Sequence, residues 1–323
     1  MNNYIYGPKK LYVIGNGFGI HHGIKCNYTS FCDWLKANRQ DVHKNLIRIY
    51  GDCDGDWWSN FEENLTNFDP DKYPNKVGRT SFFDLQTELI QLYGEDGKAA
   101  IDEFEMKDKE GIRNRYRLAE VIARFEMGQL KDDLNKAFGD WVEKLEKPKK
   151  DQKIDWIDSE AFFFTFNYTR TLEDLYGVDE DNVLHIHGSV DNHVFVIGHN
   201  MTIDDMLQRD TEQYAYDRNP FDDMGEDEAR LALFDYIADE LRKPVEEIIE
   251  ENKNYFNDLL SIKEMTVLGF SYSPIDLPYL KRIIEVAGKD IKVILGWHDE
   301  KDEDRAKAFK KDMNLSNCEL FEF

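Results

Sequence analysis

The stretch Leu11-Tyr-Val-Ile-Gly-Asn-Gly-Phe-Gly19 decides the predicted fold. Its first four residues form a short, continuous apolar run, which is typical of a strand buried on both faces of a sheet. Glycine follows at once, so the chain can turn sharply there, and its backbone amides can approach a phosphate closely. The third glycine, Gly19, comes one residue too early for the dinucleotide pattern GxGxxG. A plain tight turn and a phosphate-binding turn therefore both stay open at Gly15–Gly17.

Apolar runs of the same kind return in the second half of the chain. They cover residues 161–166, 183–187, 194–197, 265–269 and 291–295, and residues 319–323 are predicted to form an edge strand. Because these runs are continuous rather than alternating, they favour a parallel sheet with both faces covered. Helical patterns between the runs then predict an α/β fold with a Rossmann-like, doubly wound sheet.

Residues 29–154 differ from this pattern, because they contain helical stretches and no convincing strand. We interpret them as a large helical insertion that acts as a cap. Residues 1–28 and 155–323 are then the Rossmann-like nucleotide-binding domain. The basic run 147–153 is interpreted as a linker. The acidic stretch 221–251 keeps an apolar stripe at helical spacing, which favours a helix with a solvated face.

Composition restricts the classes of partner. The 323 residues include 65 acidic and 41 basic side chains, a formal net charge of −24, so nucleic acid is not an expected partner. No apolar run is long enough for a transmembrane helix, and the N-terminus lacks the features of a signal peptide, so we expect a cytoplasmic protein without a membrane partner. The four cysteines form no CxxC pair, which favours reduced thiols over a disulfide framework.

Residues that could carry chemistry follow the predicted strands directly. Because the carboxyl ends of parallel strands meet at one edge of a sheet, we expect these residues to line a single crevice. Each also has a structural interpretation, as a helix cap or a plain loop. The candidates are Gly15, Asn16, Gly17 and Phe18; Asn167, Tyr168 and Thr169; His185 and His187; His199 and Asn200; and Gly269 and Ser271.

The two histidines of the apolar run 183–187 call for separate hypotheses. Strand alternation predicts that His185 and His187 lie on the same face of their strand. An HxH pair can chelate a metal, but no third ligand stands at a clear metal spacing, so no metal site is predicted. A neutral imidazole at His187, just before Gly188, suits a general base. His185 lies further inside the sheet, where a fixed hydrogen bond is expected.

Several of these residues together resemble the AbiH family, which is associated with bacteriophage abortive infection. The resemblance covers most of the chain, and its motifs are specific in combination. It rests on Ile14-Gly-Asn-Gly-Phe18 with His21 and Gly23, on Thr165-Phe-Asn-Tyr-Thr169 with Thr171-Leu-Glu173, on His185-Ile-His-Gly188, and on Gly198-His199. That family usually has an acidic residue after Gly-Asn-Gly-Phe, where this chain has Gly19.

A more distant similarity is to sirtuins and to sirtuin-like NAD-hydrolysing defence domains. Gly15 and Gly17 correspond to the glycine turn of sirtuins. Asn167 corresponds to the asparagine that follows a strand in sirtuins, and His187 corresponds to their catalytic histidine. The two CxxC pairs of the sirtuin zinc module are absent, so lysine deacylation is not expected. Cleavage of a nucleotide's glycosidic bond would not need that module.

The two resemblances imply a phage-defence protein with a sirtuin-like nucleotide pocket that hydrolyses NAD or a related nucleotide, with no other cofactor. They imply catalytic roles for His187 and Asn167. Ligand-binding roles are implied for Gly15, Asn16, Gly17, Phe18, His21, Tyr168, Thr169, His199, Asn200, Gly269 and Ser271. Two alternatives stay open: a nucleotide sensor without catalysis, and an interaction module that recognises a phage component. A phage-derived trigger fits all three hypotheses, and the sequence leaves self-association open.

Overall fold

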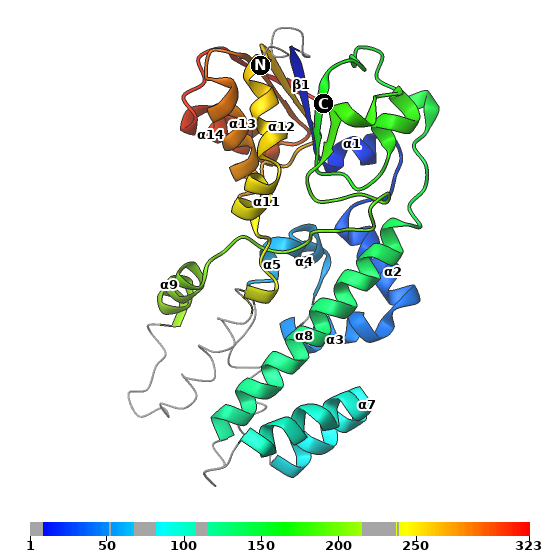
Figure 1. The fold of residues 1–323 in the computed structure, drawn as a ribbon, viewed down its shortest axis with the longest axis vertical. Helices are drawn as coiled ribbons and strands as arrows, with labels where there is room; N and C mark the ends of the chain where they lie inside the picture. Colours follow the sequence, from blue (N-terminus) through cyan, green and yellow to red (C-terminus); the bar gives the residue numbers. More distant parts are fainter. Residues whose placement is uncertain (1–8, 52, 68–81, 108–114, 215–236, 238) are drawn as a thin grey trace. The chain divides into compact units, whose positions relative to one another are not determined.

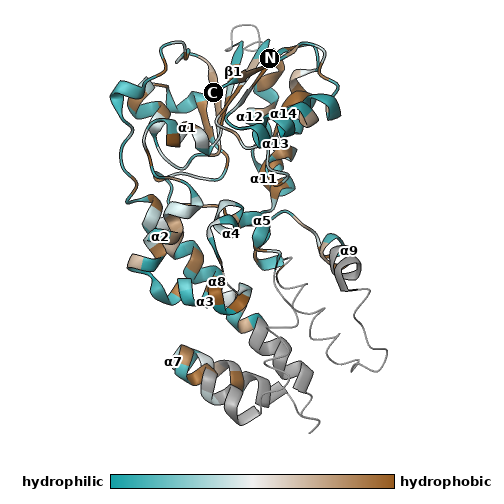
Figure 2. Ribbon diagram, turned by 180° about the vertical axis from the view of Figure 1, so that it is seen from behind, coloured by the Kyte–Doolittle hydropathy of each residue, from teal (hydrophilic) through white to brown (hydrophobic). Residues whose placement is uncertain are grey.

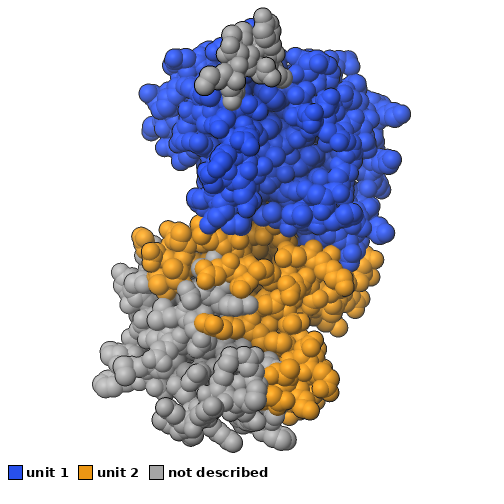
Figure 3. Space-filling model, viewed as in Figure 1, with its two compact units in different colours: residues 1–34, 138–196, 243–323 blue, residues 35–137, 197–242 orange. Residues whose placement is uncertain are grey.

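The computed structural model describes residues 9–51, 53–67, 82–107, 115–214, 237 and 239–323 (Figure 1). It divides into two compact units, coloured separately in Figure 3. Unit 1 consists of residues 1–34, 138–196 and 243–323, and unit 2 of residues 35–137 and 197–242. The predicted insertion, 29–154, and unit 2 share residues 35–137.

Unit 1 is built on one parallel sheet, as the continuous apolar runs predict. Its strands lie in the order β3-β2-β1-β4-β5-β6, and every neighbouring pair is parallel. The central strand β1 pairs Leu11 with Phe162 on one side and with Met265 on the other. The strands are β1 (Lys10–Ile14), β2 (Phe162–Thr165), β3 (Val183–His185), β4 (Glu264–Leu268), β5 (Lys292–Trp297) and β6 (Cys318–Glu322).

Helices cover both faces of this sheet, so the Rossmann-like, doubly wound prediction is confirmed. On one face, Leu11 and Val13 pack in a core with α11 (Val245–Glu251), α12 (Lys253–Asp258), α13 (Leu277–Ala287) and α14 (Glu300–Asp312). On the other face, Tyr12 and Ile14 pack against α1 (Asn16–His21) and the π-helix η2 (Leu172–Tyr176). Figure 2 shows α14 as largely hydrophilic, since only its inner residues, such as Phe309, join the core.

Unit 2 is helical in its described part. It includes α3 (Gln40–Tyr50), α4 (Gly55–Ser59), α5 (Phe61–Asn64), α7 (Phe82–Lys107), α9 (Ile203–Tyr214), the last four residues of α2 (Tyr28–Asn38) and most of α8 (Arg115–Val142). The Trp58 and Phe61 rings stack with centroids 5.2 Å apart, and both side chains are fully buried. Arg48 pairs with the buried carboxylate of Glu126 at 2.7 Å.

Two predicted strands need correction. The run 183–187 forms a strand only as far as His185, and residues 194–197 form no strand. The amide of Val196 donates instead to the carbonyl of His187, and the Val196 carbonyl accepts from the Tyr168 hydroxyl. Because loop atoms already satisfy this segment, it does not add to the sheet. The final run is confirmed as edge strand β6.

Candidate functional site

The order of the strands marks the edge where a ligand would bind. Chain connections run outward from β1 in one direction and from β4 in the other, so the order reverses between these two neighbours. Ligands of open α/β sheets bind outside the carboxyl ends of the strands, at such a reversal. The predicted site residues after β1, β2, β3 and β4 all belong to unit 1 and follow these carboxyl ends.

At the reversal itself, the glycines serve close packing of the backbone. The Gly15 amide donates to the Leu268 carbonyl at 2.9 Å, and the Gly17 amide donates to the Gly269 carbonyl at 2.8 Å. A Cβ at Gly15 would lie 2.4 Å from the Gly269 oxygen, and a Cβ at Gly269 would lie 2.2 Å from the amide nitrogen of Phe18. Gly269 also has a φ of +60°, which favours glycine. The two amides expected to receive a pyrophosphate are both bonded within the chain in this conformation.

The other residues of the first turn also make contacts within the chain. The Asn16 side-chain amide donates to the Cys26 carbonyl at 3.1 Å, and Phe18 is fully buried in the core. His21 is exposed, with Nε2 3.2 Å from the Gln152 carbonyl. Its neighbour His22, which the sequence did not single out, is fully buried.

Both ring nitrogens of His22 are bonded. Nδ1 donates to the Phe18 carbonyl at 2.7 Å, so Nε2 accepts from the Tyr176 hydroxyl at 2.8 Å. Burial lowers the pKa of His22, in agreement with a neutral ring. The sequence does indicate a histidine after the first strand, where a buried ring would need hydrogen-bond partners. It does not indicate which of His21 and His22 is the buried one.

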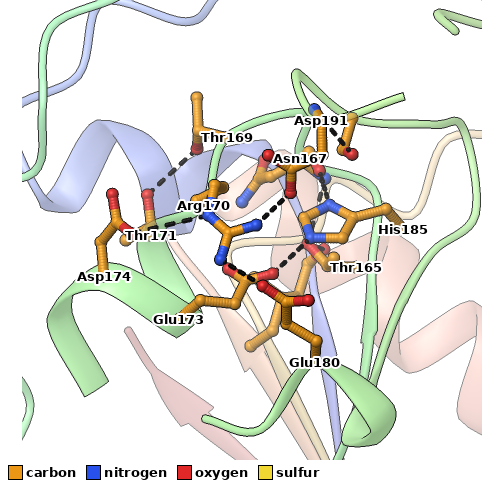
Figure 4. A network of polar contacts seen from close by, with 12 residues as sticks. Thr165, Asn167, Thr169, Arg170, Thr171, Glu173, Asp174, Glu180, His185 and Asp191 are labelled. Carbon is orange, nitrogen blue, oxygen red and sulfur yellow. Dashed lines mark hydrogen bonds and ion pairs between the residues drawn. The ribbon is translucent and has the colours of Figure 1, made fainter. Parts of the chain in front are cut away.

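The ends of β2 and β3 hold a network of polar contacts, drawn in Figure 4. The Asn167 amide nitrogen donates to Thr165 Oγ1, and its side chain donates to the Gly15 carbonyl, each at 3.1 Å. His185 lies between the carbonyl of Asn167, 2.7 Å from Nδ1, and Oε1 of Glu173, 2.9 Å from Nε2. The expected fixed hydrogen bond of His185 is thus present, and a second one accompanies it.

Residues around this network hold the loops after both strands. The Tyr168 hydroxyl donates to the Val196 carbonyl at 3.0 Å, and the hydroxyls of Thr169 and Thr171 are 3.0 Å apart. Arg170 forms ion pairs with three carboxylates, those of Asp174, Glu180 and Asp191. These contacts fix the backbone that carries Asn167.

His187 has different surroundings from His185, so the prediction that both lie on one face is wrong. The strand ends at His185, and alternation no longer applies two residues later. The ring of His187 contacts Phe166 and Tyr279, with centroids 5.3 and 5.4 Å away, and both belong to the core beneath α13. His185 reaches Glu173 of η2, which packs on the other face.

The polar partners around His187 are a buried charge pair. Its Nε2 is buried, 3.7 Å from Oδ1 of Asp276, and has no hydrogen-bond partner among the described residues. Lys243, 1% exposed, places Nζ 3.3 Å from the same oxygen. Burial and, second, the charge of Lys243 hold the pKa of His187 well below its usual value, so the ring is neutral near pH 7.

Sequence reasoning missed Lys243 and Asp276. Lys243 stands just before α11 and Asp276 just before α13, so both lie at helix starts rather than at strand ends. A lysine in an otherwise apolar core, with a carboxylate beside it, cannot be read from local patterns, since burial depends on packing between elements far apart in the chain.

The remaining candidates do not join these clusters. His199 belongs to unit 2, where Nε2 donates to the Ile237 carbonyl at 2.9 Å and Nδ1 accepts from the Met201 amide at 3.2 Å. Asn200 lies in unit 2 beside it. Ser271 is exposed, and its carbonyl accepts from Arg305 at 3.2 Å. The acidic stretch 221–251 falls mostly outside the described residues, which omit 221–236 and 238.

Two further observations concern metals and membranes. Within the described ranges, no group of three or more His, Cys, Asp or Glu side chains could hold a metal ion. In the same part of the chain, no helix combines the length and the apolar character needed to cross a membrane.

The fold and the polar carboxyl edge define a Rossmann-like α/β protein with a helical second unit. The model of the family "Bacteriophage abortive infection AbiH" matches residues 11–297. The chain therefore belongs to the AbiH family, and this confirms the family resemblance and supports a role in abortive infection. No match was found among curated proteins.

Proposed function

We propose that this protein acts in phage defence by binding NAD or a related nucleotide at the carboxyl edge of unit 1 and hydrolysing its glycosidic bond. Loss of the nucleotide in the cytoplasm would stop an infected cell, and hence the phage. The nucleotide is the substrate, and the proposal requires no further cofactor. A phage component would act as the trigger.

The observation that carries this proposal is the ring of His187. Buried polar atoms are nearly always hydrogen-bonded, and an exception calls for an explanation, of which a catalytic role is one. Nε2 of His187 is such an exception, and it belongs to a residue just beyond the carboxyl end of β3. The neutral ring carries a lone pair on one of its two nitrogens, and in the tautomer protonated at Nδ1 the acceptor is Nε2, which can take a proton from a water or a ribose hydroxyl.

In this mechanism the bond between the nucleobase and the ribose breaks, and a water oxygen bonds to the same sugar carbon. His187 accepts the proton that this water loses. The imidazolium that forms would face Oδ1 of Asp276, 3.7 Å from Nε2, while the charge of Lys243 on the same oxygen opposes it. Pocket electrostatics stabilise the oxocarbenium-like sugar. Asn167 contributes through the loop after β2, since its side-chain amide already donates to Gly15. Because His187 is only 3% exposed, the substrate must reach it in a conformation in which the surrounding loops have opened.

The test is incubation of the purified full chain with NAD, NADP, ATP and ADP-ribose, followed by product analysis. We expect His187→Ala to lower the rate of cleavage at least about 10²-fold, the usual contribution of a general base. His187→Phe, which fills the space between Phe166 and Tyr279, should lose the same activity while it keeps the fold. Equal rates for the wild type and both variants would remove His187 from the mechanism.

One observation favours the sensor as a second candidate. Gly19 replaces the acid usual in the family, and a Cβ there would lie 2.7 Å from Sγ of Cys26, so the packing has closed around the glycine. The sensor hypothesis expects nucleotide binding without product over hours. Product formation from any of the four nucleotides would reject it.

A further inference from the structure

The pair formed by Glu173 and His185 has a feature that its structural role does not explain. Both side chains are largely buried, with 7% of Glu173 and 11% of His185 exposed. Glu173 uses Oε1 for His185, but its second oxygen, Oε2, is buried and has no hydrogen-bond partner in the described part of the chain. A buried carboxylate oxygen without a hydrogen-bond donor lowers the stability of the fold. A residue that only held the loop in place would not need such an oxygen.

The hydrogen bonds also define how many protons the pair holds. A backbone carbonyl only accepts, so Nδ1 of His185 must donate to Asn167. Nε2 faces a carboxylate oxygen, which also accepts unless it carries a proton. An imidazolium ring with Glu173 as the carboxylate satisfies both partners. Oε2 is then an anionic acceptor that lacks a donor.

From this geometry we propose that Oε2 of Glu173 binds a ribose hydroxyl of the nucleotide, with protonated His185 holding the carboxylate in place. This assignment rests on the proposed function, since it names how the same carboxyl edge recognises its ligand. A carboxylate oxygen takes a hydroxyl donor, and carboxylates beyond the strand ends of α/β sheets bind ribose hydroxyls in this manner. His185 is a positioning residue here, because it acts through Glu173.

Arg170 is a charged side chain beside this pair. Its charge interacts with Glu173, and its ion pairs with Asp174, Glu180 and Asp191 lie at the surface (Figure 4). Exposed ion pairs are individually weak, so a ligand can displace Arg170 from these carboxylates at small cost. The ligand's hydroxyl would then replace an interaction that leaves Oε2 unsatisfied.

The first experiment measures binding of ADP-ribose to the full chain by calorimetry. We expect Glu173→Gln to weaken binding about tenfold, because a neutral amide oxygen accepts a weaker hydrogen bond than a carboxylate. Glutamine keeps the shape and can donate to a neutral His185, so the fold should persist. Glu180→Gln is the matched control, since it removes an exposed acid next to the same Arg170. It should bind like the wild type.

The second arm uses ADP-ribose analogues that each lack one ribose hydroxyl. One analogue should bind wild type and Glu173→Gln equally, because the hydroxyl that contacts Oε2 is gone. The proposal is overturned if Glu173→Gln binds ADP-ribose as tightly as the wild type does. It is also overturned if the substitution weakens the binding of every analogue by the same factor. Absence of any binding to the wild type overturns it as well.

A third arm needs no nucleotide. The ring ¹⁵N shifts of His185 at pH 7 should show two protonated nitrogens in the wild type and a neutral ring in Glu173→Gln. A neutral ring in the wild type would contradict the pair. Failure of this inference and failure of the hydrolase are distinguishable: Glu173-dependent binding without product rejects only the hydrolase, and cleavage unaffected by Glu173→Gln rejects only this site.

Discussion

Two regions of the same sheet edge look alike in sequence and differ in the structure. The first is the junction of the turns after β1 and β4, formed by Gly15, Gly17 and Gly269. The second is the pair of strand ends after β2 and β3, with Glu173, His185 and His187. In the junction, backbone groups bond to each other at 2.8 and 2.9 Å. In the second region, two buried polar atoms, Oε2 of Glu173 and Nε2 of His187, are without hydrogen-bond partners.

The difference shows that a glycine at a strand end is weak evidence for a phosphate site. Glycine lets two backbones approach, and whether the second backbone belongs to the ligand or to the protein depends on the fold. An unsatisfied buried polar atom is stronger evidence, because the fold gains nothing from it. The candidate site therefore lies with the ends of β2 and β3 rather than with the glycines.

The largest effect that would sharpen this comparison is expected at Gly269. Gly269→Ala should lower the free energy of unfolding by about 4 kcal/mol or more, from left-handed backbone strain and overlap with Phe18. Gly177→Ala is the matched control, because its φ of +68° is similar but no atom lies within 4 Å of the added carbon. It should cost about 1–2 kcal/mol. Equal costs in urea unfolding would mean that the junction is not tightly packed.

A smaller effect separates the two histidines. His185→Ala leaves the buried carboxylate of Glu173 without its partner, so we expect a loss of about 3 kcal/mol in unfolding free energy. His187→Phe removes no hydrogen bond at Nε2 and keeps most of the ring volume, so it should cost less than about 1.5 kcal/mol. Chemical denaturation at pH 7.5 measures both. The reverse order would show that His187 is the structural residue of the two.

The smallest effect is the pH dependence of stability. Because the folded protein holds the pKa of His187 below the unfolded value of 6.5, the unfolded chain binds an extra proton as pH falls below 6.5. Stability due to this group is complete above that pH and declines below it, by up to about 1.4 kcal/mol per pH unit. Between pH 7.5 and 5.5, His187→Phe should therefore lose about 1.4 kcal/mol less than the wild type. Parallel curves for the two proteins would contradict the assigned protonation state.

Much of unit 1 could be predicted from short-range patterns. Continuous apolar runs such as Leu11–Ile14 can be satisfied in few ways other than burial in a parallel sheet, and the structure confirms them in β1, β2, β4 and β5. The run at 194–197 failed, since Val194 is 53% exposed and loop atoms satisfy Val196. Apolar content indicates that a segment can pair, but a free neighbouring strand decides whether it does.

The sequence by itself indicated the family, the parallel sheet and the polar residues at its carboxyl edge, because apolar runs and short motifs can be recognised without knowledge of how they pack. Only the tertiary structure decided what those residues do. Asn167 was expected to be catalytic, and Asn16, Tyr168 and His199 were expected to bind a ligand; the structure shows each of them bonded within the fold. Lys243 and Asp276 were not expected, but they surround His187. Burial and hydrogen-bond satisfaction depend on groups brought together across the chain, so no local pattern contains them.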